Sequence, residues 1–242
     1  TNAANGWLVS LGSEDVIVAV IDTGVDYTHE DLKQAMWVNE DEIDGNGIDD
    51  DNNGYVDDVY GYDFAADDAD PMDDVSALRI DGNPGHGTHC AGVVGAVGNN
   101  GTGISGVAQE AKLMAIRFIS EQGEGTSAGA ALAIRYAVDN GAKIVNNSWG
   151  SESDGSDPED QVIKDAIQYA LDNDVLMVFA AGNGRMGAGY NNDTDSSPAV
   201  PASWDFENIL SVAAIDNNTR FGDFSNWGVT SVDIAAPGVK VM

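Results

Sequence analysis

The chain has 242 residues, 43% of them hydrophobic, which is enough for one globular core and short for two full domains. Its 10 basic and 41 acidic residues give a formal net charge of -31, and such a surface repels nucleic acid and anionic membranes. No apolar run approaches the roughly 20 residues of a membrane-spanning helix. We therefore expect one domain, residues 1–242, that binds neither nucleic acid nor membranes. The single cysteine, Cys90, excludes an internal disulfide and is expected to be a small buried core residue.

The acidic residues are unevenly placed. Between Glu40 and Asp81 there are 16 acids and one base, Arg79, so this segment has a local net charge of -15. The remaining 25 acids and 9 bases give the rest of the chain a net charge of -16. The density between residues 39 and 81 predicts bound cations, and the charge of the whole chain is best tolerated in salty water.

The predicted elements alternate between strands and helices along the chain. Short apolar runs that end at polar turns predict strands over 15–21, 112–118, 143–147, 175–181, 209–213 and 232–235. Helical patterns cover 91–97, with His86 at the N-terminal end of that helix, then 128–140, closed by Gly141, and 158–173. This alternation predicts an α/β fold with a mostly parallel central sheet.

Three polar turns stand at predicted strand ends, where ligands bind in such sheets. They are Asp22, the turn Ser148-Trp149-Gly150, and the turn Gly182-Asn183-Gly184. His86 opens a helix, whose positive end disfavours an imidazolium, so a histidine that accepts protons there needs a nearby carboxylate. Taken alone, each signal also has a structural explanation: an Asp as a turn former, a Gly-Asn-Gly turn as a plain turn, and a histidine without a catalytic role.

Six motifs occur in one order along the chain. They are Ile21-Asp22-Thr23-Gly24, the stretch GHGTHCAG at 85–92, NNGTGISGVA at 99–108, Asn147-Ser148-Trp149-Gly150, Ala180-Ala181-Gly182-Asn183 and Ala235-Ala236-Pro237-Gly238. With these motifs the chain resembles the subtilisin-like (subtilase) serine endopeptidases, and within them the thermitase-like, calcium-stabilised members. The resemblance implies a single-domain three-layer sandwich around the sheet, C-terminally incomplete, and a secreted protein.

The resemblance also implies the catalytic roles. His86 would be the general base, Asp22 the carboxylate that orients it, and Asn183 a donor of a hydrogen bond to the oxyanion. His89 would be structural and point towards the core. The family's nucleophilic serine follows the Ala-Ala-Pro-Gly motif, but the 242 residues stop at Met242. The only similar motif, Gly125-Thr126-Ser127-Ala128, lies before Asn183 and is read as a decoy.

We therefore expect these residues to be inactive alone and to need a C-terminal remainder, which, like a propeptide, would be a binding partner. Substrates would be proteins or peptides bound as extended strands. By resemblance the binding edges are Gly123, Glu124 and Gly125 with Ser148, Trp149 and Gly150, and Ala180, Ala181 and Gly182 form a wall of the pocket for the side chain before the cut. The segment 185–195 departs from the family pattern and is expected to line that pocket.

Calcium is the expected cofactor. Residues 49–57 fit the start of a calcium loop, D-x-D-x-N-G, although Tyr60 stands where an EF-hand has its bidentate glutamate. The expected ligands there are Asp49, Asp51, Asn53 and Asp57, with Asp58 as the other residue that could finish the shell. The family resemblance implies a site at Asp31, Val97, Asn100, Thr102 and Ile104 and another near Asp63, Asp68 and Asp70. A merely solvated acidic loop is the alternative.

A different class of function stays open at this stage. The chain could be a catalytically silent calcium-binding or interaction module that keeps the fold without the chemistry. A Gly-Thr-Ser motif in the encoded sequence beyond Met242 would favour the enzyme, and its absence would favour the silent module.

Overall fold

The computed structural model describes residues 3–73 and 85–241, and the chain divides into two compact units, residues 2–145 and 146–242. The stretch 74–84, the last part of the predicted acidic segment, lies outside the described residues. We describe each unit by itself. No helix of the described residues is long and apolar enough to cross a lipid bilayer.

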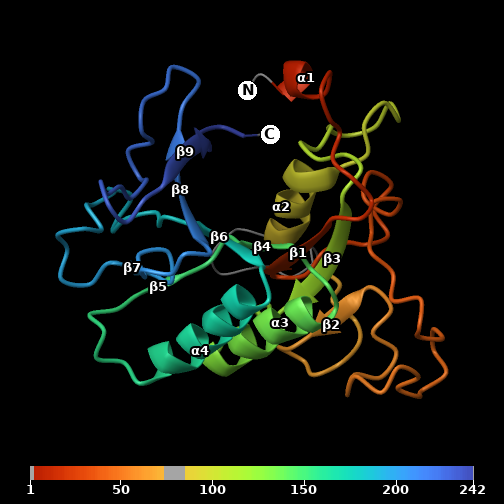
Figure 1. The fold of residues 1–242 in the computed structure, drawn as a ribbon. Coiled ribbons are helices and arrows are strands. Elements are labelled where there is room, and N and C mark those ends of the chain that lie inside the picture. The colour runs from red at the N-terminus through yellow and green to blue at the C-terminus, as the bar shows by residue number, and fades with distance from the viewer. Residues whose placement is uncertain (1–2, 74–84, 242) are drawn as a thin grey trace. The chain divides into compact units, whose positions relative to one another are not determined.

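The first unit is built on three parallel strands in the order β2 (Gly61–Asp63), β3 (Lys112–Arg117) and β1 (Ile17–Asp22). Strands β1 and β3 are buried along nearly their whole length, as expected of parallel strands with helices on both faces. Helices α2 (His86–Gly95) and α3 (Ser127–Asp139) contact both strands and lie on opposite sides of them (Figure 1). A short helix, α1 (Ala3–Gly6), precedes them.

Helix α2 packs closely because its inward face carries almost no side chains. Its buried residues are Gly87, Ala91, Gly92 and Gly95, and a Cβ on Gly95 would lie 3.1 Å from the Leu113 side chain of β3. The sequence analysis was wrong about His89, which is exposed. The glycine and alanine positions define the inward face of the helix, and His89 falls on the opposite one.

The second unit contains three parallel strands in the order β6 (Leu176–Ala180), β8 (Ile209–Ile215) and β9 (Ile234–Pro237). Helix α4 (Glu159–Asp172) contacts β6, and β5 (Ser151–Glu152) pairs antiparallel with β7 (Ala199–Val200). Strand β4 (Ile144–Asn147) contains the boundary between the two units.

The prediction of an α/β fold with mostly parallel strands is confirmed, because strands and helices alternate in both units and the pairs within β1–β3 and β6–β9 are parallel. The predicted strands and helices match observed ones with end shifts of a few residues. The sequence did not reveal β2, β5 and β7, which have two or three residues and are too short to show a period. That both units form one domain stays a prediction.

Candidate active site

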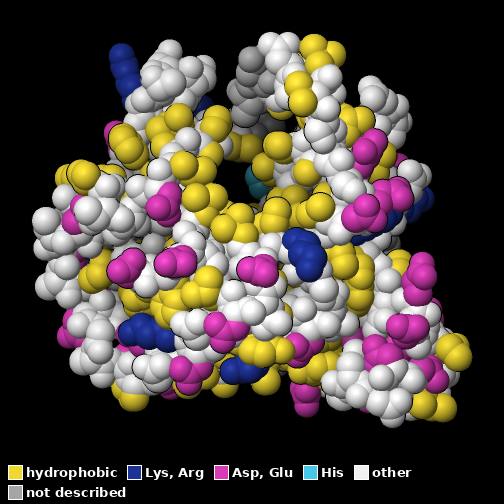
Figure 2. All heavy atoms as spheres, in the orientation of Figure 1, with side chains coloured by type: hydrophobic (Ala, Val, Ile, Leu, Met, Phe, Trp, Pro, Cys, Tyr) yellow, Lys and Arg dark blue, Asp and Glu magenta, His cyan; other side chains and the backbone are white. Residues whose placement is uncertain are grey.

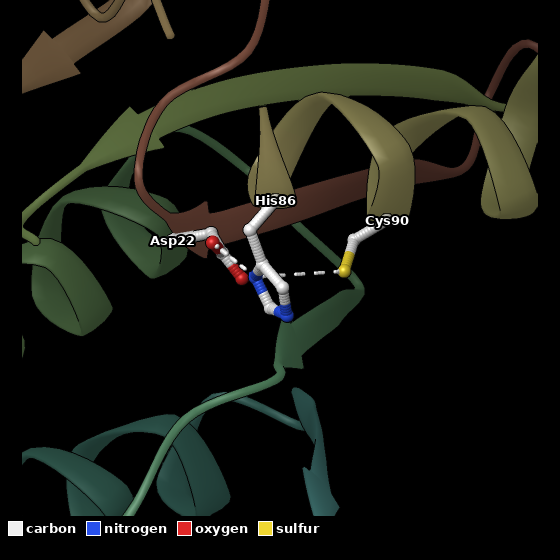
Figure 3. Close-up of side chains that lie close together, drawn as sticks. All are labelled: Asp22, His86 and Cys90. Atoms are coloured by element: carbon white, nitrogen blue, oxygen red, sulfur yellow. Dashed lines mark hydrogen bonds and ion pairs between the residues drawn. The ribbon is translucent and has the colours of Figure 1, made fainter. Parts of the chain in front are cut away.

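Asp22 and His86 form a hydrogen-bonded pair in the first unit. Asp22 is the last residue of β1 and fully buried, whereas His86 is the first residue of α2 and its side chain is 29% exposed. The distance between His86 Nδ1 and Asp22 Oδ1 is 2.7 Å. Figure 3 shows the imidazole extending from the start of α2 to the carboxylate, with its other nitrogen, Nε2, directed away from Asp22. This geometry fixes Nδ1 on the carboxylate and leaves Nε2 to exchange protons.

The carboxylate changes the protonation of the histidine. The hydrogen bond to Asp22, followed by the contact with Cys90, raises the pKa of His86 above its ordinary value of 6.5, against the opposing effect of burial. Asp22 therefore supplies the stabilisation that a protonated histidine at a helix N-terminus requires. This is the arrangement that the sequence predicts for a general base and its orienting acid.

Backbone contacts hold the two elements together at this point. The Gly87 N–H donates to Thr23 Oγ1 at 3.0 Å, and the Thr23 N–H donates to Asp22 Oδ1 at 2.8 Å. A Cβ on Gly87 would lie 2.1 Å from the carbonyl oxygen of Gly24, so only glycine permits this approach. The start of α2 is thus seated directly on the end of β1.

A second buried carboxylate, that of Asp73, joins the same two elements. It is 2% exposed and accepts hydrogen bonds from Thr23 Oγ1 at 3.1 Å, from the Thr88 N–H at 3.0 Å and from Thr88 Oγ1 at 2.8 Å. Thr23 follows Asp22 and Thr88 is the third residue of α2, so Asp73 links the end of β1 to the first turn of α2. The sequence analysis missed Asp73, because one aspartate among 16 acids carries no pattern of its own.

Cys90 lies one helical turn after His86. It is half-buried and packs against the core cluster of the first unit, as expected of a small core residue. Its Sγ lies 4.0 Å from His86 Nδ1, on the nitrogen that already binds Asp22. The thiol therefore contacts the imidazole without competing for the free nitrogen Nε2.

The Gly-Thr-Ser lookalike starts a helix. Thr126 is the N-cap of α3, and its Oγ1 accepts a hydrogen bond from the Gly129 N–H at 3.0 Å, so the motif is accounted for by capping.

The preceding stretch, 121–126, is exposed, and the Gly123 N–H donates to the Ser120 carbonyl at 2.9 Å in a turn. A Cβ on Gly125 would lie 2.6 Å from the ring of Phe118. The proposed substrate edge at Gly123–Gly125 is therefore open on the surface of the first unit.

Asn183 lies in the second unit, just after β6. It is exposed and lines two cavities of that unit, of about 240 Å³ and about 310 Å³. Ser148, Ala180 and Gly182 line both of them, and Trp149 and Gly150 line the larger. The Trp149 ring packs edge-on against Phe179 of β6, with ring centroids 5.5 Å apart. The predicted oxyanion donor and these pocket residues thus share one concave surface; the convergence of Asn183 with Asp22 and His86 stays a prediction.

The acidic loop, which we define as residues 42–58, turns its carboxylates towards one another. Ligand-type oxygens of Glu42, Asp49 and Asp51 lie within 4.8 Å of each other. Figure 2 shows Asp and Glu side chains gathered over this part of the first unit, which is drawn in orange in Figure 1. Among the ion pairs of the described residues, none involves these three acids. Three carboxylates at this spacing without a cationic side chain fit a hard divalent cation.

Glu42 is a candidate ligand that the sequence analysis missed. Its Oε1 accepts from the N–H groups of Asp50 and Asp51 at 2.7 and 3.1 Å, and its Oε2 accepts from the Asp57 N–H at 3.0 Å. The predicted ligand Asp57 instead accepts from the N–H groups of Asn46 and Gly47. The predicted ligand Asn53 is exposed, and its Nδ2 donates to the carboxylates of Asp51 and Asp58 in the same loop.

The second predicted calcium site is partly assembled. Asp31 is 3% exposed, and its carboxylate accepts from Asn100 Nδ2 at 2.6 Å and from the Ile104 N–H at 2.9 Å. Its carbonyl oxygen accepts from the Val97 N–H at 2.9 Å. Thr102 is tied into the same loop because its N–H donates to Asn100 Oδ1. The structure thus places Asn100 and Ile104 on the buried Asp31 carboxylate and ties Val97 and Thr102 into the same loop.

The third predicted set, Asp63, Asp68 and Asp70, does not form a three-carboxylate group among the described residues. The Asp63 carboxylate binds Arg117 Nη1 at 2.7 Å, so a guanidinium already occupies it. Asp70 accepts a hydrogen bond from the Tyr27 hydroxyl at 2.9 Å. A metal at this place stays a prediction with less support than the other two.

The segment 185–195, which departs from the family pattern, reaches the larger cavity through Tyr190. Arg185 in this segment binds Glu152, which also lines the cavity, and the two form an ion pair at 2.9 Å. The sequence analysis named the segment but neither this ion pair nor Glu152, because residues 33 positions apart in irregular segments share no detectable period.

Comparisons with known proteins show the family of this chain. The model of the subtilase family matches residues 13–241. A thermophilic serine proteinase of Bacillus sp. (strain AK1) is 38% identical over 236 residues, which are 98% of this chain and 47% of that protein. Thermitase of Thermoactinomyces vulgaris is 34% identical over 236 residues, 98% of this chain and 67% of that protein. The chain thus spans about half to two thirds of the length of these relatives.

Solved structures agree as well. Fervidolysin from Fervidobacterium pennivorans, described as a keratinolytic enzyme related to subtilisin, superposes with a TM-score of 0.70 at 31% identity, covering 97% of this chain and 30% of that one. The epidermin leader peptide processing serine protease of Staphylococcus aureus gives a TM-score of 0.70 at 26% identity, covering 98% of this chain and 55% of that one. With a family match across nearly all its residues and a pair of side chains arranged as a base and its orienting acid, this chain belongs to the subtilase family.

Proposed function

We propose that this chain belongs to a serine endopeptidase that hydrolyses peptide bonds of proteins. The observation that carries the proposal is the 2.7 Å hydrogen bond between His86 Nδ1 and the fully buried Asp22. Ser127 is not the serine that we propose as the nucleophile, because its Gly-Thr-Ser motif is the capped start of α3.

In the reaction, the serine hydroxyl oxygen attacks the carbonyl carbon of the substrate while His86 Nε2 takes the hydroxyl proton. Asp22 holds the imidazole in place and stabilises the imidazolium. Asn183 donates a hydrogen bond to the oxyanion that forms on the carbonyl oxygen. His86 then returns the proton to the leaving amine as the C–N bond breaks, and water releases the acyl group by the same steps.

Substrates are extended peptide segments of proteins. The exposed edges at Gly123, Glu124 and Gly125 and at Ser148, Trp149 and Gly150 are suited to pairing with a substrate backbone. The side chain before the cleaved bond would enter the larger cavity, of about 310 Å³, which Ala180 and Gly182 line. Ala181, which is 1% exposed, lines the smaller cavity instead. A secreted location stays a prediction of the family resemblance.

Calcium is the cofactor we propose for the acidic loop and for the loop 97–104. Glu42, Asp49 and Asp51 would hold one ion, and Asp31 with the loop oxygens would hold the other. A bound cation supplies charge neutralisation and rigidity there and takes no part in the peptide-bond chemistry. The support is the spacing of three carboxylates that form no ion pair among the described residues in the first case, and in the second the hydrogen bonds that hold the loop 97–104 against the buried Asp31 carboxylate.

The test uses the full-length protein and a fluorogenic peptide. We expect turnover that a serine-directed covalent inhibitor abolishes and that His86→Ala lowers by several orders of magnitude, because base, acid and nucleophile act as a unit. His89→Ala is the matched control, since His89 lies on the same helix and is exposed, and it should leave turnover unchanged. Ser127→Ala should also be active. Turnover that resists the inhibitor, or that Ser127→Ala abolishes, would contradict the proposal.

A further inference from the structure

The cavity of about 310 Å³ in the second unit has apolar walls and one carboxylate. Trp149, Ala199 and Val200 provide apolar surface, and Glu152 is the one acidic residue among the described residues that line it. The Glu152 side chain is 43% exposed and lines the cavity, so its charge can act on a substrate side chain there. A free carboxylate in such a wall would favour a substrate side chain that carries a positive charge.

Glu152 is not free, because Arg185 binds it. Arg185 Nε donates to both Glu152 oxygens at 2.9 Å. The same guanidinium donates to both oxygens of Asp195, at 2.9 and 3.0 Å, and to the Ser197 carbonyl oxygen at 2.9 Å. Arg185 itself is not among the residues that line the cavity. It therefore offsets the charge of the pocket carboxylate from outside the pocket, and shares its single positive charge between Glu152 and Asp195.

The guanidinium is held in this position from several directions. It stacks over the Tyr190 ring, with Cζ 4.2 Å from the ring centroid, and the Tyr190 hydroxyl donates to Glu152 Oε1 at 3.3 Å. Planar stacking and paired hydrogen bonds to carboxylates are the properties that distinguish arginine from lysine. A lysine or arginine side chain of a substrate would have to share Glu152 with this fixed cation and approach its positive charge.

We propose that Arg185 sets the substrate preference of this pocket: by neutralising Glu152 it makes the pocket select an uncharged aromatic or aliphatic side chain before the cleaved bond, rather than lysine or arginine. The inference rests on the proposed endopeptidase function and adds the residue that keeps basic side chains out of this pocket.

The test compares kcat/KM of the full-length protein on peptides that differ only in the residue before the cleaved bond, phenylalanine or leucine against lysine or arginine. The wild type should prefer the uncharged residues. Arg185→Gln uncovers Glu152 and should raise the ratio of basic to uncharged cleavage about three- to fivefold, the range expected of a partly exposed charge pair. The double variant Arg185→Gln with Glu152→Gln should return to the wild-type ratio. Arg220→Gln removes an exposed positive charge from the same unit away from the cavity and should leave the ratio unchanged.

The outcomes separate the two proposals. If the wild type cleaves none of the peptides, the proposed function fails. If it cleaves them but prefers lysine or arginine, or if a folded Arg185→Gln keeps the wild-type ratio, the assignment of Arg185 is overturned while the function stands. Should Arg185→Gln melt below the assay temperature, Glu152→Gln alone decides: it leaves Arg185 in place without its pocket partner and should lower the ratio, and an unchanged ratio contradicts the proposal.

Discussion

Asp22 and the acidic loop show two ways in which this chain places carboxylates close to other groups. Asp22 is fully buried, and a neighbouring histidine from a different element meets one of its oxygens. In the acidic loop, both oxygens of Glu42 and both oxygens of Asp49 accept N–H groups of the loop itself, and carboxylate oxygens of Glu42, Asp49 and Asp51 lie within 4.8 Å of one another.

The Asp22–His86 pair and the acidic loop are suited to different chemistry because they are held in different ways. Asp22 and His86 are fixed by a strand end and a helix start, which are rigid, so their geometry exists before any ligand arrives. The acidic loop folds around its own backbone and concentrates negative charge without a cationic side chain among the described residues. The first arrangement is suited to moving a proton and the second to holding a cation.

The largest expected effect comes from breaking the rigid pair. Asp22→Asn in the full-length protein should lower kcat by about 10⁴-fold, the size measured for the equivalent change in other Asp-His-Ser enzymes, because the amide holds the imidazole in the wrong tautomer. Since Asp22 raises the pKa of His86, and the base must be neutral to act, the variant should also shift the acidic limb of its residual activity to lower pH. The control is Asp15→Asn, an exposed residue just before the same strand. Residual activity with an unshifted acidic limb would contradict the pairing.

A chelator tests the acidic loop. If calcium binds the folded protein, its removal should cost about 2.7 kcal/mol when the ion had been at a hundredfold excess over its Kd, and the melting temperature should fall clearly. The double variant Glu42→Gln with Asp49→Asn should melt lower in calcium and respond less to the chelator. Asp165→Asn with Asp172→Asn, on the exposed side of α4, removes the same charge and should keep the full response. An unchanged melting temperature in excess chelator would contradict the proposal that calcium binds the folded protein.

Asp73 sharpens the comparison because it is buried like Asp22 and accepts hydrogen bonds from the neutral groups of Thr23 and Thr88. Asp73→Ala leaves Thr23 Oγ1 and the Thr88 N–H without their acceptor, and the free energy of unfolding should fall by about 1–3 kcal/mol. Asp73→Asn keeps one acceptor oxygen and should cost less. Asp41→Ala, an exposed acid near the loop, should change stability by no more than about 0.5 kcal/mol. Urea unfolding measures all three, and equal losses for Asp73→Ala and Asp41→Ala would show that Asp73 does not join the two elements.

The last effect is the pH dependence of stability from His86. Its pKa is raised in the folded protein, so the pair stabilises the fold fully below pH 6.5, and this contribution is lost as the pH rises through the raised value. Each pKa unit of the rise is worth about 1.4 kcal/mol. The stability difference between the wild type and His86→Gln should therefore be largest at pH 6 and shrink at alkaline pH. A stability difference that grows with pH would mean that folding lowers the pKa of His86, contrary to this prediction.

Much of this molecule follows from short-range sequence patterns. The apolar runs of β1, β3 and β6 have one arrangement that buries them, a parallel sheet covered by helices, and a parallel sheet presents its strand ends to ligands. Asp22 is the polar residue that ends such a run, and His86 opens a helix of small residues, so both could be singled out before any contact was known.

Only the tertiary structure decided the partners of polar side chains in irregular segments. Asp73 meets Thr23 across 50 positions, Arg185 meets Glu152 across 33, and Glu42 enters the acidic loop through backbone N–H groups up to 15 positions away. Such contacts follow no helical or strand period, because they depend on how turns bring separate segments together. The direction of His89 belongs here too: the sequence places it on α2, but the close packing of glycine and alanine against β1 and β3 determines which face of that helix is buried.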